Sequence, residues 1–180
     1  NGAGKTTLLR LVIKHLEPTS GSVHITGDTQ GMLQTGIGFH DELSGFENSK
    51  NSLIYNGLSK TERVAALRDV IEFVELGDML FHPIKTYSLG MRARLEFATA
   101  TSVRPSILVI DEVMGAGDGY FAKKSAERMR EFIQSTTLLL VTHALPQIID
   151  YCDRAIWLDE GRVRLDGEVK DVVAAYEKAM

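Results

Sequence analysis

Apolar residues recur at helical spacing in several stretches of this chain. The first stripe comprises Leu8, Leu9, Val12, Ile13 and Leu16. Pro18 and Gly21 end it. Ser59 and Glu62 have the spacing of a capping box. The apolar face that follows comprises Val64, Leu67, Ile71 and Val74. These patterns predict helices over residues 6–16, 60–76, 91–102, 118–134 and 169–178, with a shorter helix inside the polar stretch 41–58.

Other apolar runs are short and continuous. Residues 107–110 and 136–142 lack the alternation of a strand with one wet face, so we expect both to be buried strands. Residues 22–26 alternate like a short strand, and residues 36–39 predict another extended piece. Residues 155–165, with a turn at Glu160 and Gly161, predict a hairpin. Helices that alternate with buried strands predict an α/β fold with a mainly parallel sheet and a single domain.

Composition narrows the class of protein. The chain has 180 residues and is 44% hydrophobic and 24% charged, which is ordinary for one globular domain. Its net charge is −4, whereas a nucleic-acid-binding domain is usually basic. A local basic patch is still compatible with this net charge. Cys152 is the single cysteine, which excludes a disulfide framework and a multi-cysteine zinc site. No apolar run approaches the roughly 20 residues that a spanning helix needs.

The residues at the start of the chain have the chemistry of a phosphate site. Asn1, Gly2, Ala3, Gly4, Lys5, Thr6 and Thr7 match the second half of a P-loop, G-x-x-x-x-G-K-[ST]. Glycines let backbone N–H groups surround phosphate oxygens, and the N-terminus of the following helix adds partial positive charge. Lys5 can reach the β- and γ-phosphates, Thr6 can ligate Mg²⁺, and Thr7 can hold another phosphate oxygen. The alternative is a glycine-rich helix start without a ligand. Since the chain begins inside this motif and without methionine, we expect a fragment.

A buried strand ends in two acids, Asp111 and Glu112. This matches a Walker-B pattern, in which Asp111 holds Mg²⁺ and Glu112 polarises the attacking water. Adjacent carboxylates repel each other, and a cation offsets that repulsion. The alternative is a strand that runs into a solvated acidic turn. A P-loop earlier in the chain favours the metal site, since phosphate and metal sites share the carboxyl edge of a parallel sheet.

Two further motifs complete an ordered set. Residues 87–92 (Tyr-Ser-Leu-Gly-Met-Arg) precede a predicted helix, and residues 141–143 (Val-Thr-His) close a strand. Together with the P-loop and the paired acids, they resemble the ATP-binding subunit of ABC transporters over essentially the whole chain. The resemblance implies that Ser88 and Gly90 bind the γ-phosphate held by a second copy. It also implies that Asp118 is the D-loop aspartate and that His143 senses the γ-phosphate. Taken singly, Ser88 and Asp118 could be helix caps and His143 could be structural.

The finer resemblance is to ATPases that export O-antigen, capsule or teichoic acid. It rests on residues 38–48, on Met91, Arg94 and Leu95 after the signature, and on the stretch 111–121. Residues 155–161 and 172–176 are also similar to that subfamily. Two positions depart from the wider family pattern. His40 stands where most members have a glutamine, so it is a candidate metal contact or a plain loop residue. Leu89 replaces a small residue of the signature.

The resemblance implies a P-loop NTPase fold of the ABC type, one ATPase domain over 1–180, and a helical subdomain over about 41–104. It implies ATP and Mg²⁺, a second copy that closes the site, and permease subunits bound near residues 40–56. It also implies a peripheral place on the cytoplasmic face of the membrane, and export of a glycan. Nucleic acid is not expected as a partner. Three rival hypotheses stay open: an exporter of another cargo, a soluble ABC protein of translation or repair, and a module that holds nucleotide without hydrolysis.

Overall fold

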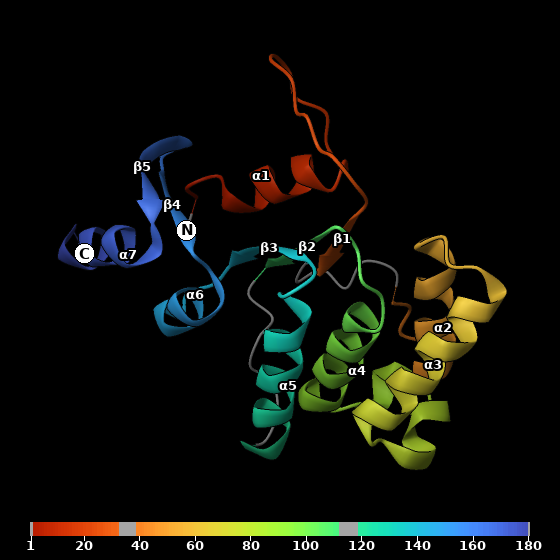
Figure 1. The fold of residues 1–180 in the computed structure, drawn as a ribbon. Helices are drawn as coiled ribbons and strands as arrows, with labels where there is room; N and C mark the ends of the chain where they lie inside the picture. Colours follow the sequence, from red (N-terminus) through yellow and green to blue (C-terminus); the bar gives the residue numbers. More distant parts are fainter. Residues whose placement is uncertain (1, 33–38, 112–118, 180) are drawn as a thin grey trace.

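Helices and strands alternate along most of the chain (Figure 1). The computed structural model describes residues 2–32, 39–111 and 119–179. The elements in chain order are α1 (Lys5–Val12), β1 (Thr29–Met32), α2 (Gly45–Tyr55), α3 (Lys60–Val74), η1 (Gly77–Phe81), η2 (Ile84–Thr86), α4 (Leu89–Thr101), β2 (Ile107–Asp111), α5 (Gly119–Phe132), β3 (Thr137–Val141), α6 (Leu145–Tyr151), β4 (Arg154–Asp159), β5 (Arg162–Glu168) and α7 (Val169–Ala179). In the described ranges, no helix combines the length and the apolar character needed to cross a membrane.

A three-stranded parallel sheet in the order β1-β2-β3 forms the centre of the fold. Successive residues of β2 point to opposite faces. Val109 packs with Leu9 of α1 on one face, and Leu108 and Ile110 pack with Phe97 of α4 and residues of α5 on the other. Figure 1 shows α1 on one side of the strands, with α4 and α5 on the opposite side. The predicted α/β layering is therefore confirmed, and β2 is buried on both faces as expected.

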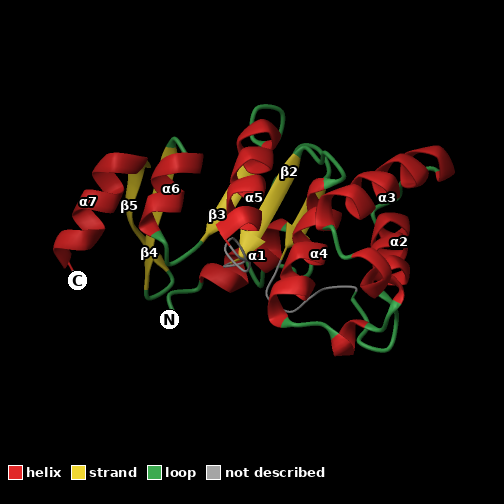
Figure 2. Cartoon of the chain, turned by 90° about the horizontal axis from the view of Figure 1, so that it is seen from below, coloured by secondary structure: helices red, strands yellow, loops and turns green. Residues whose placement is uncertain are grey.

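Helices α2 and α3 lie beyond α4, away from the sheet (Figure 2). Serine caps begin both helices, and Ser44 and Ser59 each complete a capping box with a glutamate. The buried hydroxyls of Ser49 and Thr99 lie 2.9 Å apart and join α2 to α4. Phe73 of α3 contacts the rings of Phe97 and Phe121, which ties α3 to α4 and α5. The division of the chain into a helical subdomain over about 41–104 stays a prediction.

The hairpin prediction near the C-terminus is confirmed. Strands β4 and β5 pair antiparallel, with Glu160 and Gly161 at the turn. Both residues have positive φ, 47° and 75°, which a two-residue hairpin turn of this twist requires. Helix α7 covers the hairpin, where the rings of Trp157 and Tyr176 meet edge to face at 5.5 Å.

Four expectations from the sequence are wrong in detail. Helix α1 ends at Val12, because Lys14 adopts a left-handed backbone with φ of 58°. Residues 22–26 form no strand. The strand in this part of the chain is β1, where Gln30 and Gly31 interrupt the apolar pattern expected of a strand. Strand β3 is half-buried rather than buried, since it lies at one end of the described sheet. The second predicted extended piece, residues 36–39, is not among these errors, because residues 36–38 lie outside the described ranges.

The fourth error concerns the buried face of α3. Val64 and Ile71, taken from the pattern as part of the apolar face, are exposed at 57% and 42%. The helix instead buries Ala66, Val70, Phe73 and Val74. Phe73 contacts Phe97 of α4 and Phe121 of α5, and these contacts fix which face of α3 is buried. The pattern within α3 alone does not contain this information.

Candidate functional site

A glycine turn begins α1 and leaves the first N–H groups of that helix without a side-chain cap. Gly2 and Gly4 have φ of 84° and 92°, a left-handed backbone that residues with a Cβ rarely adopt. Gly4 is the N-cap of α1, yet it has no side chain to satisfy the donors, and the first turn carries no acidic residue. By contrast, serine hydroxyls cap α2, α3 and α4. The start of α1 therefore keeps both its donors and its partial positive charge for an anion.

The side chain of Thr6 meets Asp111 at the carboxyl end of the central strand. The hydroxyl Oγ1 of Thr6 donates a hydrogen bond of 3.2 Å to Oδ2 of Asp111, although the residues are 105 positions apart. Asp111 is 7% exposed, and the packing of Leu9 on Val109 holds α1 against β2. A hydroxyl and a carboxylate beside a phosphate site are hard oxygen donors of the kind that Mg²⁺ prefers. The residues that the structure brings together thus fit the predicted metal site.

Lys5 and Thr7 flank Thr6 in the first turn of α1. Lys5 is half-buried at the first position of α1, and Thr7 is exposed. The carbonyl of Ala3 accepts a hydrogen bond of 3.2 Å from the N–H of Gly161, so the β4–β5 turn supports the glycine turn. Sequence analysis missed this contact, since a backbone hydrogen bond between distant segments leaves no residue pattern. Asn1, Glu112 and Asp118 lie outside the described residues.

His143 lies at the same edge of the sheet as Asp111. Asp111 pairs in register with Val141, and His143 follows two residues later, exposed. The N–H of Ala144 donates to Oγ1 of Thr142 at 3.0 Å, which shapes the turn after β3. His143 thus follows the strand residue that pairs with Asp111 by two positions. A direct contact with phosphate stays a prediction.

Ser88 and Gly90 begin α4. The hydroxyl of Ser88 accepts a hydrogen bond of 3.2 Å from the N–H of Met91, so its role as a helix cap is confirmed. Leu89 is 81% exposed, and a Cβ added at Gly90 would approach only Oγ of Ser88, at 3.9 Å. This turn is therefore open to solvent. The phenol of the preceding Tyr87 donates to the Met79 carbonyl at 2.7 Å, and burial raises the pKa of Tyr87.

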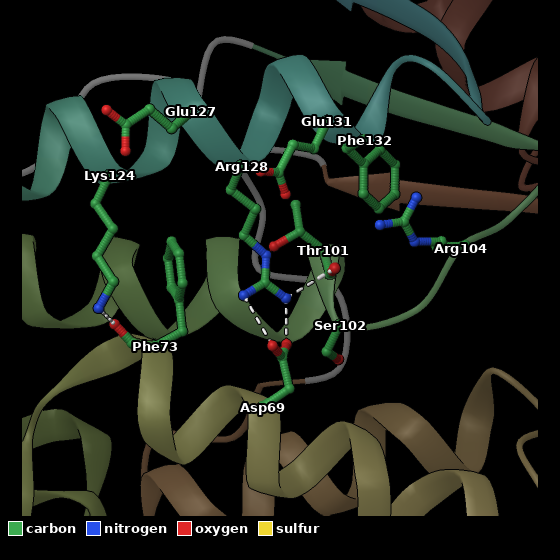
Figure 3. A pocket seen from close by; sticks show the side chains of 10 residues that line it. All are labelled: Asp69, Phe73, Thr101, Ser102, Arg104, Lys124, Glu127, Arg128, Glu131 and Phe132. Carbon is green, nitrogen blue, oxygen red and sulfur yellow. Dashed lines mark hydrogen bonds and ion pairs between the residues drawn. The ribbon is translucent and has the colours of Figure 1, made fainter.

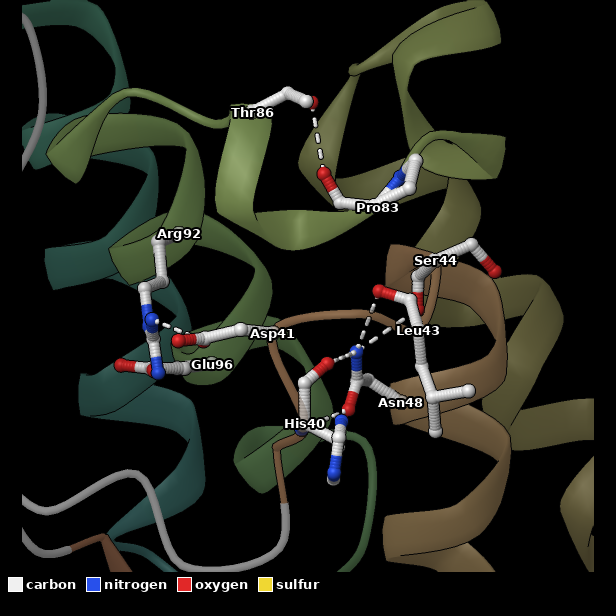
Figure 4. Close-up of polar contacts among 9 residues, drawn as sticks. All are labelled: His40, Asp41, Leu43, Ser44, Asn48, Pro83, Thr86, Arg92 and Glu96. Atoms are coloured by element: carbon white, nitrogen blue, oxygen red, sulfur yellow. Dashed lines mark hydrogen bonds and ion pairs between the residues drawn. The ribbon is translucent and has the colours of Figure 1, made fainter.

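His40 is exposed, and its backbone is held by a buried asparagine (Figure 4). The His40 N–H donates to Oδ1 of Asn48 at 2.6 Å, and Nδ2 of Asn48 donates back to the His40 carbonyl at 3.0 Å. Asn48 is 0% exposed, which marks it as a structural residue of this loop. The role of His40 as a metal contact stays a prediction.

A separate cavity of about 380 Å³ lies between α3, α4 and α5 (Figure 3). Arg128 forms an ion pair with Asp69 there and donates to the Thr101 carbonyl at 2.9 Å. Lys124 pairs with Glu75 and donates to the Phe73 carbonyl at 2.9 Å. These ion pairs and hydrogen bonds join α5 to α3 and α4 across the cavity. Cys152 is half-buried, and burial raises the pKa of its thiol, as suits a packed cysteine.

Comparisons with known proteins agree with this arrangement. A family model described as "ABC transporter" matches residues 1–115. The O-antigen export system ATP-binding protein RfbB of Myxococcus xanthus is 44% identical over 100% of this chain and 41% of its own length. RfbB of Klebsiella pneumoniae is 40% identical over 100% of this chain and 74% of its own length. The teichoic acids export ATP-binding protein TagH of Listeria innocua is 37% identical over 99% of this chain and 53% of its own length.

This chain thus spans well under two thirds of two of these three relatives. Among solved structures, one described as the ATP-binding subunit of an ABC transporter aligns with a TM-score of 0.84 and 27% identity. It covers 98% of this chain and 79% of that one. A post-hydrolysis ATP-binding cassette aligns with a TM-score of 0.78 and 22% identity, over 93% of this chain and 81% of that one, and supports the fold.

A pair of glycine substitutions tests the role of the glycine turn in anion binding. Gly4 lies in the turn, and Gly57 has a similar positive φ but lies far from it. Gly4→Ala forces a Cβ into a left-handed backbone and should cost about 1–2 kcal/mol of unfolding free energy. Gly57→Ala, at φ of 76° with open space around it, should cost a similar amount. Only Gly4→Ala should weaken binding of MgADP, measured by isothermal titration calorimetry. Equal affinities in the two variants would contradict an anion site at α1.

Proposed function

We propose that this chain, which belongs to the ABC transporter family, binds ATP, hydrolyses it and so drives export of a polysaccharide. The observation that carries the proposal is the meeting of three features at one sheet edge. These are the uncapped start of α1, the Thr6 hydroxyl and the Asp111 carboxylate. Together they offer backbone donors for phosphate and oxygen donors for its cation.

ATP binding is assigned to the start of the chain. The N–H groups of residues 2–7 surround the phosphates, and Lys5 neutralises charge on the β- and γ-phosphates. Thr7 and Asn1 are assigned further phosphate contacts. Thr6 and Asp111 would hold Mg²⁺, with His40 as a further candidate; the ion neutralises charge on the phosphate oxygens. The support for Lys5 and Thr7 is their place in the first turn of α1.

Hydrolysis is assigned to the residues around the γ-phosphate. Glu112, which follows Asp111 in the sequence, accepts a proton from the attacking water. His143 donates a hydrogen bond to the γ-phosphate from the adjacent strand end. Catalysis then consists mainly of positioning and charge neutralisation, as in other phosphoryl transfers to water.

A second copy of the chain completes the site in this proposal. Ser88 and Gly90 of that copy contact the γ-phosphate, and Asp118 lies at the contact between copies. Support comes from the exposed first turn of α4, whose Leu89 projects into solvent. ATP joins the two copies, and hydrolysis separates them. That cycle supplies the mechanical work of transport.

The cargo and membrane partner are proposed from the relatives. The names of the relatives above specify export of O-antigen or teichoic acids. We assign this chain a glycan cargo, permease subunits that dock near residues 40–56, and a place on the cytoplasmic face of the membrane. An exporter of another cargo is the nearest rival, because the ATPase chemistry would be the same.

Glu112→Gln tests the hydrolytic assignment in the complete protein. Loss of the general base should slow ATP hydrolysis by about 100-fold or more while ATP stays bound. ATP-bound dimers should accumulate and be seen by size-exclusion chromatography with light scattering. Glu72→Gln, an exposed acid on α3, is the matched control and should hydrolyse ATP normally. Normal turnover in Glu112→Gln would contradict the assignment.

Co-purification from membranes in mild detergent tests the transport assignment. The expected result is a complex with a multi-spanning permease, identified by mass spectrometry. Deletion of that permease should leave a lipid-linked glycan inside the cell. A protein bound instead to ribosomes or DNA, or free of membrane partners, would overturn transport while leaving the ATPase assignment intact.

A further inference from the structure

Two loops that are distant in sequence are joined into one unit beside the start of α4. The carbonyls of Leu43 and Asp41 accept hydrogen bonds from Ile84 N–H at 3.0 Å and from Lys85 N–H at 3.1 Å. The N–H of Gly45 donates to the His82 carbonyl at 3.3 Å. Residues 41–45 and 82–85 are therefore two loops held side by side by backbone hydrogen bonds, with an isolated antiparallel bridge between Ser44 and Pro83. The first loop follows His40, and the second leads to Ser88.

The first loop is fixed from inside by Asn48. Its Nδ2 donates to the carbonyls of His40, Leu43 and Ser44, each at 3.0 Å, while its Oδ1 accepts from the His40 N–H. The side chain is 0% exposed, so these bonds are made without competition from water. The loop thus has one strongly favoured conformation.

Close packing at Gly45 also fixes the residue before Ser88 against the first loop. A Cβ placed on Gly45 would lie 2.3 Å from the phenolic oxygen of Tyr87 and 2.9 Å from Leu95. Only glycine fits between them. Tyr87 immediately precedes Ser88, so this contact leaves little room for the start of α4 to slide along α2.

Arg92 links this unit directly to the turn that carries Ser88. Its backbone N–H donates to the Ser88 carbonyl at 3.0 Å, within the first turn of α4. Its guanidinium donates to Oδ1 of Asp41 at 2.9 Å and to Oε1 of Glu96 at 3.0 Å (Figure 4). The planar guanidinium is thus held between two carboxylates, that of Asp41 on the first loop and that of Glu96 on α4.

We propose that Asp41 and Arg92 are positioning residues, which hold Ser88 and Gly90 at a fixed orientation to the loop that carries His40. The inference rests on the proposed function, in which Ser88 and Gly90 serve the nucleotide of the second copy. The ion pair is partly exposed, with side-chain exposures of 33% for Arg92 and 61% for Asp41, so it adds little to stability. Its value is geometric, because small displacements of a group that contacts the reacting phosphate lower turnover strongly.

Charge reversal in the complete protein tests the pair. Asp41→Arg and Arg92→Asp should each lower kcat for ATP about tenfold, since the first turn of α4 loses its orientation. The affinity for MgADP should change less than about twofold, because the glycine turn is not part of this unit. The double reversal should restore kcat, since Arg at 41 then faces the carboxylates at 92 and 96. Reversal of the exposed Arg154–Asp166 pair on β4–β5 is the matched control and should leave kcat unchanged.

Hydrogen exchange gives a readout that does not depend on hydrolysis. The amides of Met91 and Arg92, which donate to Ser88, should lose protection in each single reversal and regain it in the double reversal, with the melting temperature little changed. Unchanged protection and kcat in the single variants, or no recovery in the double variant, would overturn the inference. A wild-type protein that fails to hydrolyse ATP would overturn the proposed function, and the exchange data would still decide whether Asp41 and Arg92 position the turn.

Discussion

The hydrogen bond from Thr6 to Asp111 is the constraint on which the rest of the site depends. It joins the first turn of α1 to the end of the central strand, and it forms only if α1 lies flat on the sheet. The contact of Leu9 with Val109 provides that packing. Because strands β2 and β3 are parallel and in register, the same arrangement places Val141 beside Asp111 and His143 just beyond it. The packing of α1 on β2 and the register of β2 with β3 therefore bring the start of α1, Asp111 and His143 to one edge of the sheet.

Helices α3, α4 and α5, on the side of the sheet opposite α1, form the main core. Phe73, Phe97 and Phe121 join α3, α4 and α5, and the Arg128–Asp69 pair adds a polar contact across the same junction. The core is thereby continuous from the sheet to α3. The two joined loops, residues 41–45 and 82–85, fix the position at which α4 begins and therefore the position of Ser88. The sheet edge at Asp111 and the exposed turn of α4 are thus parts of one packed structure, as the proposed site shared between two copies requires.

Much of this arrangement could be predicted from the sequence. The glycine turn, the buried strand that ends at Asp111, the Ser59 capping box and the hairpin turn at Gly161 all depend on local rules, and all appear as expected. Distant contacts could not be predicted in this way. The buried face of α3 depends on rings supplied by other helices. Strand β1 has a polar and a glycine residue at its centre and is held by pairing with β2. The role of Asn48 depends on carbonyls that only the folded loop directs toward it.

Thr6 and Asp111 are the proposed ligands of the cation that accompanies the nucleotide. Electron–nuclear double resonance with Mn²⁺ in place of Mg²⁺ and ADP bound to the complete protein tests this claim most directly. We expect phosphorus couplings that place the ion on the nucleotide. We also expect Thr6→Val and Asp111→Asn each to weaken Mn²⁺ affinity at least about tenfold, by loss of a hard oxygen donor. Unchanged couplings and unchanged Mn²⁺ affinity in both variants would contradict the claim.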